Sequence, residues 1–186
     1  LEWYPVGRIL LWIAAFAVIT TTATLLTLGA DTDTITAALR RGLLKVLSAG
    51  DGQGSVEIER LVDMLVILAP LAATILSMVT LTLNLWLAGK ITQTSGRLNR
   101  PWPELRSTAL PSMTLVALLV AAALSFVGGM LALLAQIVTA ALVIGYALVG
   151  FAVLHTLTLS LNSRGFWLGG IYAVVVMFGW PIVAIF

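Results

Sequence analysis

Residues 107–163 read STALPSMTLVALLVAAALSFVGGMLALLAQIVTAALVIGYALVGFAVLHTLTLSLNS, and these 57 residues contain no Asp, Glu, Lys or Arg. As one helix this stretch would run about 85 Å, whereas the hydrocarbon core of a bilayer is about 30 Å thick. The chain must therefore fold back within it, and Gly128-Gly129 is the best turn signal. We expect two membrane-spanning helices here, at residues 112–127 and 136–158, joined by a tight or partly buried hairpin.

Three further uncharged stretches each have the length of one membrane-spanning helix. They are apolar on all sides rather than alternating with a period of two, which favours helices over a β-barrel. The sequence therefore predicts an all-α, polytopic transmembrane bundle of five spans, with residues 1–186 forming a single domain. The three stretches are residues 9–30, 64–89 and 165–186, and they leave an outer loop at 31–63 and a basic inner loop at 90–111.

The composition of the 186 residues agrees with a membrane protein. It is 60% hydrophobic and 10% charged, with a mean hydropathy of +1.08, whereas soluble domains carry about 25% charged residues. The sequence has no Cys and one His, so we expect no disulfide, metal site or other cofactor. It shows neither a dense basic run, which nucleic-acid binding needs, nor a catalytic constellation. We therefore predict neither a nucleic-acid partner nor an enzyme.

The distribution of Lys and Arg predicts how the bundle is oriented, because cytoplasmic loops are richer in these residues. With the N-terminal segment inside, six Lys and Arg residues fall on the inner side and four on the outer side. The inner residues are Arg8, Lys90, Arg97, Arg100, Arg106 and Arg164, and the outer residues are Arg40, Arg41, Lys45 and Arg60.

The outer loop contains the pattern of an amphipathic helix. Asp31 and its neighbours supply N-cap and first-turn acids. Apolar side chains then recur every three or four residues, which is typical of a helix lying in the membrane interface. Gly-rich residues 50–54 end this helix, and Ser55 caps the next. The predicted helix either shields the end of the bundle or acts as a lid or partner-binding element; its apolar stripe is Ile35, Leu39, Leu43 and Val46.

The inner loop combines cations with an aromatic side chain between two prolines. Pro101 and Pro103 fix an extended backbone around Trp102, and Trp is typical of the membrane–water interface. Arg97 and Arg100 suit contacts with lipid phosphates. Anchoring to the bilayer and docking of a cytoplasmic partner both fit this loop.

Polar residues within or beside the spans are the candidate ligand contacts, because burying them unpaired in a bilayer is costly. We expect Asp63, Gln136 and Tyr146 to line an outward cavity that binds a small molecule. The structural alternatives are a local pair with Arg60 for Asp63, hydrogen bonding between helices for Gln136 and ring packing for Tyr146. Pro70 is expected to kink its helix, and the hydroxyls of Thr20, Thr21, Thr22 and Thr24 to bond back to their own helix.

Small residues mark helix faces that can approach one another closely in lipid. Gly165 and Gly169 form such a face on the last span. If the protein has no cavity, this face predicts a subunit that packs against another membrane protein or a second copy of itself.

Several short motifs together resemble a bacterial family of membrane proteins known as domain of unknown function 2232, in its alphaproteobacterial branch. They are NLWLAGK at 84–90, SGRLNRPWP at 95–103, VLH at 153–155 and FGWP at 178–181, and EWYP at 2–5 also fits. The residues that carry the resemblance are Asn84, Trp86, Gly89, Pro101, Trp102, Pro103, His155, Gly179, Trp180 and Pro181.

The resemblance implies a multi-pass protein of the bacterial inner (cytoplasmic) membrane. The family is distantly similar to the substrate-binding membrane components of energy-coupling-factor transporters, which hold a small molecule and dock on a membrane partner. Its members have additional N-terminal spans. This agrees with a sequence that starts at Leu1 rather than Met and ends at Phe186 within an apolar run, so we expect a longer natural chain. The two functions that follow are a transporter-like small-molecule-binding component and an accessory or scaffolding subunit.

Overall fold

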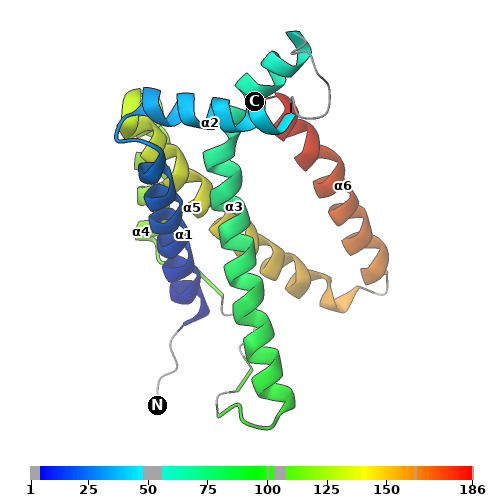
Figure 1. Cartoon of the computed structure of the whole chain (residues 1–186). Helices are drawn as coiled ribbons and strands as arrows, with labels where there is room; N and C mark the ends of the chain where they lie inside the picture. The colour runs from blue at the N-terminus through cyan, green and yellow to red at the C-terminus, as the bar shows by residue number, and fades with distance from the viewer. Residues whose placement is uncertain (1–4, 48–55, 100, 103–107, 162, 186) are drawn as a thin grey trace.

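The regular structure of this chain is helical throughout the described residues, and no strand occurs among them (Figure 1). The computed structural model describes residues 5–47, 56–99, 101–102, 108–161 and 163–185, with the side chains of 176 and 178–185 outside this description. The elements are α1 (Val6–Leu28), α2 (Thr32–Leu47), α3 (Val56–Thr94), α4 (Met113–Leu124), α5 (Gly129–Leu157), the 3₁₀ turn η2 (Thr158–Ser160) and α6 (Arg164–Ile185).

Three of the described helices are long and apolar enough to cross a membrane: α1, α3, and α5 together with η2. Helix α3 has 39 residues, so it rises about 58 Å. Helix α4 is apolar but has 12 residues, a rise of about 18 Å that is shorter than the hydrocarbon core. The prediction of an all-α chain with helices of membrane-spanning length is therefore confirmed, and the count of five spans stays a prediction.

The turn between α4 and α5 is tighter than predicted. Gly128 and Gly129 adopt φ values of +94° and +63°, a region that residues with a Cβ rarely enter. The chain reverses over residues 125–127 together with the two glycines, so α5 begins at Gly129 and not at residue 136. The expected hairpin loop is replaced by two turns of helix, and Gln136 lies within α5.

The core forms where α1, α3 and α5 meet. Small side chains dominate this contact, and they let helices approach closely where lipid supplies no hydrophobic drive. One buried cluster joins all three helices through Ala14, Ala17, Met78 and Ala141. A second cluster joins α1 and α5 to α2 through Leu25, Ile35 and Ile137.

Helix α2 lies across one end of the bundle (Figure 1). Asp31 caps it as predicted, accepting hydrogen bonds from the Thr34 backbone N–H at 2.9 Å and the Thr34 hydroxyl at 2.7 Å. These bonds lower the pKa of the exposed Asp31 carboxyl below its ordinary value. An ion pair of 2.8 Å between Arg40 and Asp63 joins α2 to α3, so the predicted amphipathic helix contacts α1, α3 and α5.

Helix α6 stands apart from this bundle (Figure 1). It meets the end of α5 through Tyr172, whose ring stacks on Phe151 at 5.6 Å between centroids and faces the His155 ring at 6.1 Å. Beyond these rings α6 packs mainly on η2.

The segment that returns from α3 to α4 is fixed at both of its ends. Helix α3 closes with a Schellman motif, in which the N–H of Gly96 bonds to Gln93 O and the N–H of Arg97 to Thr92 O, each at 3.1 Å. The returning backbone then crosses the first turn of α1 so closely that a Cβ on Gly7 would overlap the carbonyl oxygen of Ala109.

We expect Gly7→Ala to lower the free energy of unfolding by about 1–3 kcal/mol, because overpacking a fixed backbone forces it to move. Gly42→Ala is the matched control, since nothing lies within 4 Å of a Cβ built on Gly42 and alanine favours helix. The measurement is denaturation of the purified protein in mixed micelles. If Gly7→Ala were as stable as the wild type, the backbone at Ala109 would have to lie farther from Gly7 than it does in this structure.

Candidate ligand-binding site

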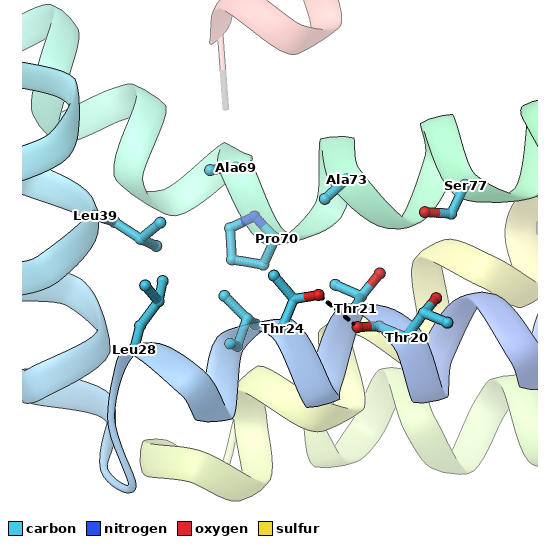
Figure 2. Close-up of a pocket in the computed structure, with 10 residues that line it drawn as sticks. Thr20, Thr21, Thr24, Leu28, Leu39, Ala69, Pro70, Ala73 and Ser77 are labelled. Atoms are coloured by element: carbon cyan, nitrogen blue, oxygen red, sulfur yellow. Dashed lines mark hydrogen bonds between the residues drawn. The ribbon is translucent and has the colours of Figure 1, made fainter. Parts of the chain in front are cut away.

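A cavity of about 250 Å³ lies between α1, α2 and α3 (Figure 2). Every lining residue from α1 and α3 belongs to the uncharged stretches 9–30 and 64–89, and no charged side chain lines the cavity. The wall consists of Thr20, Thr21, Thr24, Leu25 and Leu28 from α1, Leu39 from α2, and Ala69, Pro70, Ala73 and Ser77 from α3.

Burial distinguishes the floor of the cavity from its rim. Leu25 and Pro70 are buried, as is Thr21. Thr24, Leu28 and Ala73 are exposed. The cavity therefore opens past these three exposed residues, at the side of the bundle between α1 and α3, while α2 lies across its end.

Two of the three lining threonines bond to their own helix. The hydroxyl of Thr20 donates to Phe16 O at 2.9 Å, with Ala17 O at 3.1 Å. The hydroxyl of Thr24 donates to Thr20 O at 2.8 Å, the dashed line in Figure 2. This is the back-bonding that the sequence predicts for these two residues.

Thr21 departs from this pattern. Its side chain is 5% exposed and points from α1 toward α3 (Figure 2). Its hydroxyl oxygen has no hydrogen-bond partner in the part of the chain that the structure describes. An unpaired buried hydroxyl costs about 1–3 kcal/mol. Thr22 and Thr139 also carry unpaired buried hydroxyls, but Thr21 is the one that lines the cavity.

Pro70 shapes the opposite wall. It lies inside α3 and is buried, and its lack of an N–H leaves the carbonyl of Val66 without its usual helical donor. The next turn is reinforced by Thr74, whose hydroxyl donates to Pro70 O at 2.8 Å. The cavity thus lies beside an interrupted hydrogen-bond ladder in a membrane-length helix.

The residues predicted to line a cavity lie elsewhere. Asp63 is exposed and pairs with Arg40 at the start of α3. Gln136 and Tyr146 are half-buried on α5, about 15 Å apart along its axis. None of the three lines the cavity described above.

Two of the motif residues do meet. Gly89 faces the ring of Trp102, which would lie 3.6 Å from a Cβ built on that glycine. The adjacent Lys90 ammonium lies 4.4 Å from the centroid of the same ring, within the range of a cation–π contact. Its Nζ also donates to Gln93 Oε1 at 3.0 Å. The inner loop therefore folds back on the end of α3.

The remaining candidates are not gathered into one place. Asn84, Trp86, Arg97 and Pro101 are exposed, and nothing lies within 4 Å of a Cβ built on Gly165 or Gly169. His155 Nδ1 lies 3.1 Å from Phe151 O. The predictions for Arg100, Pro103 and residues 48–55 fall outside the described residues, as do the surroundings of Gly179 and the side chains of Trp180 and Pro181.

Two features of the sequence correspond to the walls of the cavity, but neither predicts the cavity by itself. One was the run of threonines in the first span, and the other was Pro70 in the second. Each has an ordinary structural explanation alone. Only the pairing of α1 with α3 brings them to the same cavity, on opposite walls.

No family model matches the sequence, and no curated protein or solved structure is significantly similar to it.

We expect Thr21→Val to leave the free energy of unfolding unchanged or to raise it by about 1 kcal/mol, because it removes an unpaired buried hydroxyl. Thr74→Val is the matched control: it is also buried, but its hydroxyl is bonded, so we expect a loss of about 0.5–1.5 kcal/mol. Denaturation of both variants without added ligand measures the difference. Equal losses would mean that the Thr21 hydroxyl is bonded within the protein.

Proposed function

We propose that this chain is the membrane domain of a bacterial inner-membrane protein that binds a small molecule between α1, α2 and α3, as a component of a transporter. In this proposal α4, with its flanking residues, and α6 complete five spans. The resemblance of the motif residues to a family distantly similar to substrate-binding transport components supports the same class of function.

The cavity between α1, α2 and α3 is the observation that carries the proposal, because it lies between two membrane-length helices and its wall includes Thr20, Thr24 and Ser77. Polar residues within membrane-spanning segments are the usual marks of a functional site. The position beside Pro70 adds to this, since transport sites often occur where spanning helices are interrupted.

Ala73→Phe tests the site by placing a ring at the rim of the cavity. We expect the protein purified in mild detergent to retain a bound small molecule in native mass spectrometry. We expect Ala73→Phe to lose at least nine-tenths of that occupancy, because about 250 Å³ of space is too small to hold both the ring and a ligand.

Ala72→Phe is the control, since Ala72 is the exposed neighbour on α3 and is not part of the cavity wall. It is expected to keep the bound molecule and the stability of the wild type. A bound molecule that both variants retain would place the binding site elsewhere.

The accessory or scaffolding subunit is a second candidate, favoured by α6. This helix stands apart from the bundle (Figure 1), with Gly165 and Gly169 open on its surface. Such a helix suits packing against another membrane protein.

Mass spectrometry of proteins that purify with the full-length chain separates the two candidates. A membrane coupling protein and ATPases in comparable amounts would support the transporter component. A different membrane complex in comparable amounts, with no small molecule bound, would support the accessory subunit.

A further inference from the structure

We infer that the end of the molecule where α1 begins and α3 ends binds the phosphate groups of anionic phospholipids, through Arg8, Lys90 and Arg164. This inference goes beyond the proposed function, because it concerns the bilayer around the helices and not the ligand of the cavity.

The residues that border the uncharged stretches differ in charge between the two ends of the molecule. Arg8 directly precedes the first stretch, Lys90 directly follows the second and Arg164 directly precedes the last. At their other ends, the first stretch is followed by Asp31 and the second is preceded by Asp63. In Figure 1, α1 and α6 begin and α3 ends toward the lower part of the view, whereas α2 lies across the upper end. The border is therefore cationic at one end and acidic at the other.

The border cations lie at the depth of the lipid headgroups. The uncharged helical residues of α1 and α3, 9–28 and 64–89, rise about 30 and 39 Å, and the hydrocarbon core is about 30 Å thick. A bilayer around these helices places Arg8 and Lys90 in one headgroup layer. The ring of Trp102, whose centroid lies 4.4 Å from the Lys90 ammonium, is of the type that favours the same layer.

The acids that border the stretches at the opposite end are satisfied within the protein. Asp31 accepts two hydrogen bonds from Thr34, and Asp63 pairs with Arg40. A surface of the lipid is therefore not needed to balance either carboxylate.

The border cations lack such partners. In the part of the chain that the structure describes, every acid belongs to the opposite end: Asp31, Asp33, Glu57, Glu59 and Asp63. Over the whole sequence, residues 1–8, 90–111 and 164 contain six Lys and Arg and two Glu. Most of the counter-charge at this end must come from outside the protein.

The placement of the cations favours lipid over an acidic protein as the source of that counter-charge. They belong to three helices, of which α6 stands apart from the bundle (Figure 1), so they are spread around the molecule and not gathered into one patch. Lipid headgroups surround all three helices at this depth. Lys90 is also held in place by the Trp102 ring and by Gln93 Oε1 at 3.0 Å, which fixes one cation for a phosphate to approach.

Native mass spectrometry of the full chain tests the inference. The protein is purified in mixed micelles that contain equal amounts of phosphatidylglycerol and phosphatidylcholine with the same acyl chains, and the ratio of the two lipids that stay bound is measured. We expect the wild type to favour phosphatidylglycerol. Lys90→Gln is expected to lower the ratio about five-fold, the contribution of one cation near an anionic surface, and added salt is expected to lower it as well.

Lys45→Gln is the matched control, because it makes the same substitution at an exposed cation of α2, at the opposite end. It is expected to leave the ratio unchanged, and Lys90→Arg, which keeps the charge, is expected to preserve it. Equal retention of the two lipids by the wild type, or equal losses in Lys45→Gln and Lys90→Gln, would overturn the inference without affecting the proposed cavity. Displacement of phosphatidylglycerol by an equal concentration of inorganic phosphate would also overturn it, because the cations would then bind free phosphate as well as the lipid.

Discussion

The close approach of α1, α3 and α5 is the contact on which the rest of the structure depends. Helices that lie in lipid gain little from burying apolar surface, because the solvent is equally apolar, so they associate where small side chains allow dense packing. Ala17 and Ala141 supply that surface around the fully buried Met78. With these three helices fixed, α2 lies across their end, and the space beside Pro70 becomes a pocket that opens at the side of the bundle.

The threonines of α1 distinguish this cavity from a gap between purely apolar side chains. Threonine hydroxyls in a spanning helix usually satisfy themselves by bonding to a carbonyl one turn earlier, and Thr20, Thr24 and Thr27 do so. Thr21 belongs to the same run but faces α3 with its oxygen unpaired. A valine would fill the same volume without the cost of an unpaired hydroxyl.

Much of the helical architecture follows from local patterns. Asp31 caps α2 because a carboxylate accepts N–H bonds at the start of a helix, and Gly128-Gly129 turns the chain because both residues need positive φ. The position of the cavity does not follow from such patterns, because it depends on which helices become neighbours. Asp63 looked like a ligand contact beside a span, but the approach of α2 gives it Arg40 as a partner. The crossing of Gly7 by Ala109 is likewise a tertiary event that no spacing within either segment encodes.

The continuity of α3 has a mechanical consequence. This one helix runs from the ion pair with Arg40, through the wall beside Pro70, to the lysine held over Trp102. A helix bends most readily where its hydrogen-bond ladder is interrupted, so Pro70 is the position at which α3 would bend first. The cavity lies at that position. Bending there would therefore change the distance between the two helices that form its walls.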